Sequence, residues 1–430
     1  MLAAAAIAIA VIVRPSIGRG DLRWLDIALV AYVALIALQL VPLSAPLRLS
    51  LSPALRTVDL QLRVDAPADA STDVSHPLTV DSGATLQSLC LAVAVVLVFW
   101  CARALFARGG VRIGARTVAG LGLAVAAFGI AQHATAPRAL YWLRTFRYTE
   151  PFGPYMNRSD FAMWMVMSLP LTAGYFIARL QSRQHRGGTR VWTDAFDDTA
   201  LFVTVSIGLM AAALMVGLSR SGIIGTAAAG VTLWALSEER LHRRGRARLL
   251  AGIGAVALIA FFYANTSAVA TRIADTVERG MGERLVIWRT TLPIIRDFWT
   301  VGVGAGAYER AMIVYQPSPH ETYFNHAHNE YLQLLSEGGL MLAIPAAIIL
   351  ALGVIAIRRR LGADRSAIYW VRVGAVSALV GAAVQSLWET GLRRPANTLL
   401  FAVMVAFALH PSPQPARRAA DDPAGVGDGQ

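Results

Sequence analysis

Ten long windows of this 430-residue sequence contain no Asp, Glu, Lys or Arg, and this feature allows very few folds. A helix that crosses the hydrocarbon core needs about 20 apolar residues. We therefore predict an all-α polytopic membrane protein whose spans are residues 27–47, 82–102, 117–137, 161–178, 199–219, 221–237, 249–271, 338–357, 373–388 and 395–416.

The basic residues, which are all Arg, cluster in alternate connections between these windows, and this distribution predicts the orientation. Arg-rich connections face the cytoplasm in membrane proteins, so the pattern indicates topology rather than a DNA-binding face. The predicted cytoplasmic clusters are Arg14 to Arg23, Arg103 to Arg116, Arg179 to Arg190, Arg240 to Arg248, Arg358 to Arg365, and Arg417 with Arg418. The predicted outer connections are 48–81, 138–160, 219–221, 272–337 and 389–394.

Residues 1–13 form an eleventh apolar stretch that is short for a span and has no basic n-region or cleavage site of a signal peptide. Eleven spans with this polarity would begin outside the cell. We therefore expect a span, or part of one, upstream of Met1. The last residues, 411–430, are rich in Pro, Ala, Gly and Asp, and they predict a disordered cytoplasmic tail after a transmembrane bundle of residues 1–410.

The chain contains no Lys, which excludes the P-loop lysine, Schiff-base chemistry and Ser-Lys dyads. Cys90 and Cys101 lie in one apolar window, where eleven residues of helix would separate them by roughly 16 Å, too far for a disulfide. Transporters usually carry ionisable residues inside their spans, and these spans have almost none. A reaction or a binding event at the outer face is therefore expected.

Several outer segments could bind an anion. Connection 138–160 mixes Arg with Tyr, Trp and Phe, which fits either an aromatic belt with snorkelling arginines or an edge that receives an anionic, sugar-bearing lipid. Arg220 lies in a tight turn between two spans, where the next helix begins, and is either an interfacial anchor or a phosphate ligand.

Residues 284–296 predict an amphipathic helix in the outer interface, and Gly302, Gly304 and Gly306 predict a turn.

The segment FNHAHNEYLQLLSEGG holds two histidines. We expect Asn325 to cap a helix that ends near Gly338, with His326 and His328 in its first turn, where the helix N-terminus favours the neutral imidazole of a general base. The two histidines are two residues apart and cannot copy the i, i+4 pair of zincins. One of them is a base or orients the acceptor, or both are structural, and we expect no metal and no cofactor.

Together, these motifs resemble those of the O-antigen ligase and O-antigen polymerase superfamily of bacterial envelope glycosyltransferases. The likeness covers about residues 152–400, including the outer loop 272–337. It rests on Asn157, Arg158, Phe161 and Ala162, on Ser-Arg-Ser-Gly at 219–222, on Gly-Glu-Arg-Leu to Trp-Arg at 282–289, on the glycine turn, on His-Ala-His-Asn-Glu-Tyr-Leu at 326–332, and on 392–397.

The resemblance implies a GT-C-like bundle of about 11–12 transmembrane helices in the bacterial inner membrane, with its active site facing the periplasm. It also implies inverting, metal-independent transfer of a glycan from undecaprenyl diphosphate to an acceptor hydroxyl, such as lipid A-core or a growing polysaccharide. Arg220 and Arg284 would hold the diphosphate, with Arg289 and Arg158 as weaker candidates. His328 would activate the acceptor hydroxyl, with His326 as the weaker candidate.

Four functions remain open: an O-antigen ligase, a polymerase of lipid-linked repeat units, a protein O-oligosaccharyltransferase, and a non-enzymatic flippase of lipid-linked glycans. Ligases often carry His-Asn, nine residues, Gly, two residues, then Gly, Thr or Tyr. His328, Asn329 and Gly339 fit this pattern, whereas Leu342 departs from it. The near-complete pattern favours the ligase. The near absence of ionisable residues from the predicted spans disfavours the flippase.

Overall fold

The computed structural model describes residues 1–62, 75–146, 151–184, 197–238, 284–317 and 323–411, together with residues 240, 241, 245, 247, 254 and 282. The helices are α1 (Leu2–Val13), α2 (Arg23–Leu38), α3 (Ala45–Leu51), α4 (Leu55–Leu62), α5 (Ser82–Leu105), α6 (Val111–Thr135), α7 (Arg158–Gln184), α8 (Asp198–Val216), α9 (Arg220–Leu236), α12 (Tyr308–Tyr315), α13 (Glu330–Ala363), α14 (Tyr369–Gln385) and α15 (Pro395–Ala408).

Shorter elements complete the described part of the chain. Residues 284–297 are helical, the 3-10 turns η1 (Gly20–Leu22) and η4 (Gly391–Arg393) flank longer helices, and η2 (Phe106–Gly110) is a π-helical turn. The strands β1 (Ala139–Leu140) and β2 (Arg144–Thr145) form one antiparallel hairpin. Almost all of the predicted span at 249–271 and the predicted tail from residue 412 onward lie outside the described residues.

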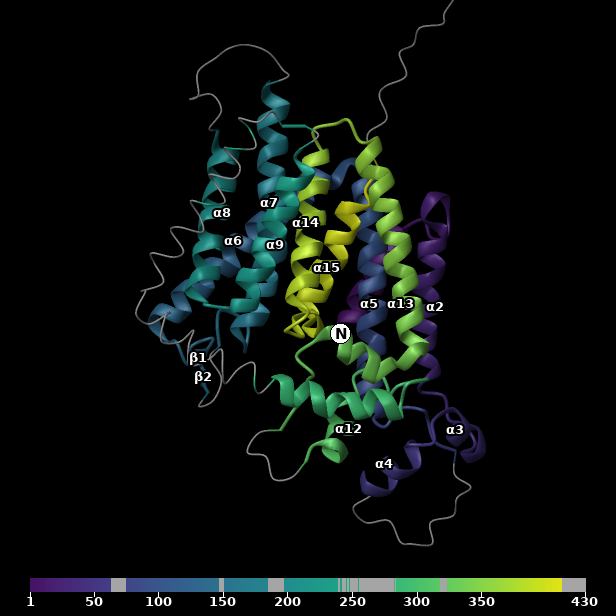
Figure 1. The fold of residues 1–430 in the computed structure, drawn as a ribbon. Coiled ribbons are helices and arrows are strands. Elements are labelled where there is room, and N and C mark those ends of the chain that lie inside the picture. Colours follow the sequence, from purple (N-terminus) through teal and green to yellow (C-terminus); the bar gives the residue numbers. More distant parts are fainter. Residues whose placement is uncertain are drawn as a thin grey trace, which may run out of the picture.

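The all-α polytopic fold class is confirmed. Within the described residues, four helical stretches are long and apolar enough to cross a membrane: Ser82–Thr135, Arg158–Ser182, Asp198–Val216 and Glu330–Ala363. The helices α5, α7, α13 and α14 run side by side in Figure 1, whereas α3, α4, α12 and the helix at 284–297 gather at one end of the bundle. Apolar side chains such as Ile344, Ile348 and Leu350 of α13 are exposed, as expected for a surface that faces lipid.

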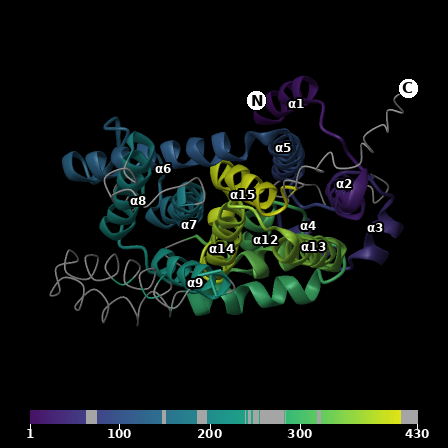
Figure 2. The same cartoon turned by 90° about the horizontal axis from the view of Figure 1, so that it is seen from above.

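Two predicted boundaries are wrong. The first span was predicted to run to residue 47, but α2 ends at Leu38, because Pro42 disfavours helical geometry in the residue before it and the Gln39 side chain bonds elsewhere. The predicted loop between the second and third spans is instead a helical corner. There α5 passes into α6 through η2, and Gly109, with φ of 95°, makes the bend. Figure 2 shows that α6 leaves this corner at a steep angle to α5.

The centre of the bundle is the crossing of α7 and α14, where glycines let the two backbones touch. A Cβ atom on Gly374 would lie 2.5 Å from the carbonyl oxygen of Pro170, and one on Gly174 would lie 2.2 Å from that of Trp370. Both distances are too short for any side chain. The crossing therefore depends on glycine on each helix, and it fixes the start of α7 relative to the end of α14.

We expect Gly374→Ala to destabilise the fold by about 1–3 kcal/mol, the usual cost of overpacking, because a backbone carbonyl cannot swing aside as a flexible side chain can. Gly353→Ala in α13 is the matched control, since a Cβ there would meet nothing within 4 Å. Thermal unfolding of the two variants in detergent measures the difference. Equal unfolding temperatures would contradict the close helix contact.

The glycine turn is confirmed and anchors the end of the bundle that carries the short helices. Gly302, Gly304 and Gly306 all have positive φ, of 70°, 109° and 81°. The Gln39 side chain donates to the carbonyls of Val301 (2.9 Å) and Glu337 (3.1 Å) and accepts from the N–H of Ala305 (2.9 Å). One buried amide directly after α2 thereby fixes the turn against the first part of α13.

The helix at 284–297 lies across this end of the bundle in Figure 1. Ile294 and Phe298 are buried in a cluster with residues of α4 and α12, and Ile287 is also buried. Leu285 and Leu292, on another side of the predicted amphipathic helix, are exposed. One face of the helix therefore packs against the protein. The opposite face keeps exposed apolar side chains, which suits a position in the membrane interface.

Candidate active site

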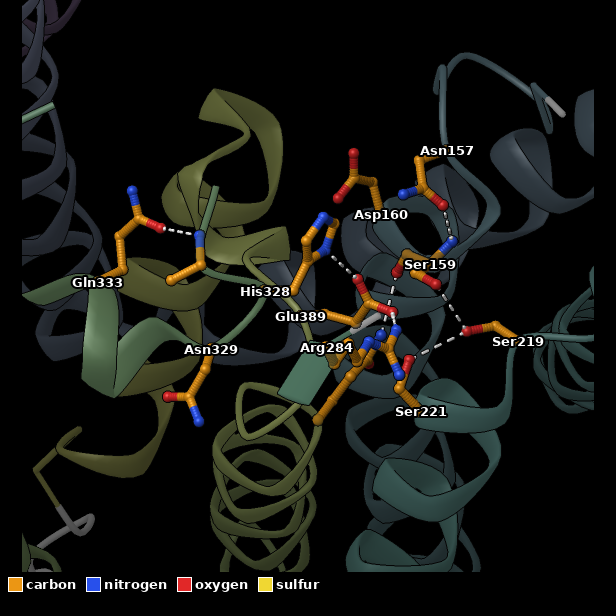
Figure 3. A network of polar contacts seen from close by, with 12 residues as sticks. Asn157, Ser159, Asp160, Ser219, Ser221, Arg284, His328, Asn329, Gln333 and Glu389 are labelled. Carbon is orange, nitrogen blue, oxygen red and sulfur yellow. Dashed lines mark hydrogen bonds and ion pairs between the residues drawn. The ribbon is translucent and has the colours of Figure 1, made fainter. Parts of the chain in front are cut away.

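A buried carboxylate lies at the centre of the candidate site. Glu389 follows the last turn of α14, and its side chain is 6% exposed. Arg284 Nη2 donates to Glu389 Oε1 (2.5 Å), and His328 Nδ1 lies 3.5 Å from Glu389 Oε2. Figure 3 shows the guanidinium and the imidazole converging on this one carboxylate. Three segments far apart in the sequence thus meet at a single point.

The charge of Glu389 is stabilised by its neighbours. Burial alone would raise the pKa of the carboxyl, but the contact with His328, the charge of Arg284 and a hydrogen bond with Ser159 outweigh burial and hold the pKa below its usual range. Glu389 is therefore ionised at neutral pH. A fixed negative charge beside an imidazole can orient it and stabilise its protonated form.

His328 is held in place by the residue that follows it. Asn329 caps α13 by accepting from the N–H groups of Tyr331 and Leu332, and its own Nδ2 donates to the carbonyl of Leu387. His328 itself has a positive φ of 47°, which is uncommon for a residue other than Gly. With 32% of its side chain exposed, the imidazole is fixed at the backbone but open to a substrate.

The prediction that Asn325 caps this helix is wrong. Because the helix starts at Glu330, neither His326 nor His328 lies in its first turn. Both asparagines are good caps by type, and the choice is made by tertiary contacts, since the N–H of Glu330 also donates to the carbonyl of Ser386 (3.0 Å). The predicted end near Gly338 corresponds to a break at Gly339, after which a second helical stretch continues to Ala363.

His326 lies in a different environment from His328. Burial lowers the pKa of His326 to about 3, and the positive charges of Arg393 and Arg394 act in the same direction. Its Nδ1 is buried without a hydrogen-bond partner among the described residues. His326 is therefore uncharged at neutral pH, and its conjugate acid is too strong to hold a proton taken from a sugar hydroxyl.

Three serines border the other side of the carboxylate. Ser219 caps α9 by accepting from the N–H of Gly222 (3.2 Å), and its Oγ lies 3.3 Å from both Ser159 Oγ and Ser221 Oγ. In Figure 3 these serines lie across Glu389 and Arg284 from His328. The predicted tight turn is confirmed, and it places the N-terminus of α9 beside the start of α7.

The remaining predicted arginines differ in their relation to the cluster. Arg220 is exposed and lies between Ser219 and Ser221, and the half-buried Arg158 directly precedes Ser159, so both border the serine group. Arg289 is exposed on the helix that carries Arg284. Among the described residues, no hydrogen bond or ion pair joins Arg289 to Glu389, His328 or the serines.

The late motif at 392–397 connects α7 and α13 through ion pairs and hydrogen bonds. Arg393 pairs with Glu337 (2.8 Å) and Glu330 (3.4 Å) of α13, and Arg394 pairs with Asp160 of α7 (2.7 Å). Asn397 donates to the carbonyl of Asp160 (2.9 Å). These contacts fix the starts of α7 and α13 around Glu389, so the motif positions the site from outside it.

Sequence reasoning missed Glu389 and Ser159. One signal could have indicated Glu389, because it is the acidic residue of the short outer connection 389–394, where it lies close to Arg393 and Arg394. A carboxylate in so short a connection needs a cationic partner if it is buried. Ser159 gave no comparable signal, since serines are frequent at helix starts.

Part of the chain matches a known protein family. A family model described as O-antigen ligase matches residues 205–346. The matched region runs from within α8 to the first half of α13, and it contains Arg220, Arg284, His326 and His328. Glu389 and Ser159 lie outside it. No curated protein matches the chain.

Proposed function

We propose that this chain, a member of the O-antigen ligase superfamily of envelope glycosyltransferases, transfers a glycan from undecaprenyl diphosphate to the hydroxyl of lipid A-core at the periplasmic face of the inner membrane. One observation carries the proposal. Arg284 and His328 share the buried carboxylate of Glu389, so a group that can bind phosphate and a group that can accept a proton lie a few ångströms apart at the end of a membrane bundle.

The donor needs a cation at its leaving group. When the bond between the anomeric carbon and the phosphate oxygen breaks, the diphosphate takes the electron pair and gains negative charge, which a preorganised guanidinium stabilises. Arg284 uses Nη2 for Glu389, and 29% of its side chain is exposed. A guanidinium has five N–H donors, so others remain for a phosphate. Arg220, beside the serine cap of α9, would bind a second phosphate oxygen.

The acceptor needs a base on the opposite side. With Nδ1 directed at Glu389, the His328 tautomer that carries its proton on Nδ1 leaves the Nε2 lone pair free to take the proton of the acceptor hydroxyl. The oxygen then bonds to the anomeric carbon as the phosphate departs, which inverts that carbon. The 3.5 Å contact between His328 and Glu389 is long for a hydrogen bond, and such contacts commonly tighten when substrate binds.

The departure from the ligase pattern at Leu342 does not remove a group from this site. Leu342 is buried against Gly338 within α13, whereas Glu389, His328 and Arg284 lie beyond the start of that helix. Gly339, which fits the pattern, has a φ of 51°, and a Cβ there would lie 2.7 Å from the carbonyl of Thr300. The ligase therefore remains the favoured function, and the polymerase is the second candidate.

A polysaccharide gel of a strain that lacks the gene tests the proposal. We expect every band above lipid A-core to disappear, glycan to accumulate on undecaprenyl diphosphate, and the wild-type gene to restore the ladder. Core that carries a single repeat, with the ladder lost, would assign the polymerase instead. An unchanged gel would contradict both and would leave protein glycosylation or transport of the glycan to be tested.

A further inference from the structure

A cavity lies at the end of the bundle opposite the candidate active site. Its volume is about 240 Å³, and its walls come from the start of α6, the last turns of α7 and the start of α14. α7 begins beside Glu389, and the 20 residues from Ser159 to Arg179 correspond to about 30 Å of helix. The cavity is therefore separate from the catalytic cluster.

The rim of the cavity is basic. Arg112 is exposed at the start of α6, and it makes no hydrogen bond or ion pair within the described part of the chain. Arg179 of α7 pairs through Nη2 with Asp197, which is occupied as the cap of α8, and its Nε is buried without a partner among the described residues. After this pairing, the rim keeps a net positive charge from Arg112, and the guanidinium of Arg179 has further N–H donors besides the one that meets Asp197.

The wall beneath this rim is more apolar than polar, and it includes the ring of Tyr175. Ala178 of α7 and Ile368 and Val371 at the start of α14 line the cavity together with Ser182, whose hydroxyl donates to the carbonyl of Ala178. An inorganic phosphate would find no use for the apolar wall, because a small hydrated anion needs polar partners on all sides. A phospholipid has a phosphate for the guanidiniums and a glycerol and acyl region for the apolar wall.

The position of the cavity also fits a lipid. It lies where α6, α7 and α14 end or begin, and basic pockets between transmembrane helices at one membrane face bind anionic headgroups. Other arginines, among them Arg358, Arg359 and Arg365, are exposed and lie in or beside the ends of helices that start or finish at this same end of the bundle. We propose that this cavity binds the phosphate of an anionic phospholipid, with Arg112 and Arg179 as its ligands.

Native mass spectrometry of the full chain in a neutral detergent tests this site. We expect wild-type protein to retain phosphatidylglycerol in preference to phosphatidylcholine. Arg112→Gln should weaken phosphatidylglycerol binding about tenfold, the loss of one charged hydrogen bond. Arg365→Gln is the matched control, because Arg365 is also exposed at this end but does not line the cavity, and it should bind as wild type does.

The arms of the experiment separate the sources of phosphate. Excess inorganic phosphate should leave phosphatidylglycerol bound. If phosphate alone displaces the lipid through Arg112, the cavity is a free-phosphate site and the lipid assignment fails. The assignment also fails if Arg112→Gln and Arg365→Gln weaken binding equally, or if phosphatidylcholine binds as tightly as phosphatidylglycerol. An unchanged unfolding temperature for Arg112→Gln excludes a general loss of folding.

Discussion

Replacing His328 with alanine is expected to lower the rate of glycan transfer by about 10²- to 10⁴-fold, the usual contribution of a general base. The imidazole is fixed by the Asn329 cap and faces Glu389, yet part of it remains open. Its loss removes proton transfer but leaves Arg284 and the diphosphate site in place. Purified protein with a lipid-linked glycan and an acceptor should therefore show a much lower maximal rate with little change in the KM for the donor.

His326→Gln is the matched control for this prediction. Because burial and two arginines lower the pKa of His326 to about 3, this side chain is uncharged throughout the physiological range and does not titrate there. Its replacement should leave the pH dependence of transfer where it is. If His326→Gln moves the acid limb of the pH profile and His328→Ala retains activity, the two assignments are reversed and His328 is not the base.

The sequence predicted helical membrane spans because the signal for them is local. Windows without charged residues mark both ends of α5 and α8 to within three residues, and they lie inside the longer helices α7 and α13, since a bilayer demands apolar length and little else. The predicted helix boundaries were wrong where tertiary contacts determine the end of a helix. α2 stops where Gln39 turns to bond the glycine turn, and the loop expected after α5 is a helical corner bent at Gly109.

The candidate site was predictable only in part, because contacts between distant segments of the chain assemble it. Arg284 and His328 could be selected by residue type and motif, but their meeting point could not, because Glu389 is more than 50 residues from either in the sequence. The choice between Asn325 and Asn329 as the cap depended on contacts with Ser386 and Leu387, which only the folded chain provides. Sequence patterns select candidate groups, and contacts between distant segments, such as those of Asn329 and Glu330 with the end of α14, bring the groups together.

Arg284→Ala is expected to lower transfer by about 10²- to 10³-fold, the usual effect of removing one preorganised group that stabilises transition-state charge. The effect should include weaker use of the donor, because the guanidinium would contact the diphosphate before and after the bond breaks. Arg296→Ala on the same helix is the matched control. Its side chain is 81% exposed and pairs with the adjacent Asp297, so its activity should stay near that of wild type.

A second role of Arg284 must be separated from the first, because it also neutralises Glu389. Removing one partner of a buried ion pair leaves an uncompensated charge that destabilises the fold. The double variant Arg284→Ala with Glu389→Gln removes both charges and should recover the unfolding temperature lost in Arg284→Ala. Its transfer rate should remain low, since no guanidinium is left for the leaving diphosphate. If the double variant instead recovers activity together with stability, Arg284 serves only to hold Glu389, and the diphosphate must be bound by other residues, with Arg220 the first to test.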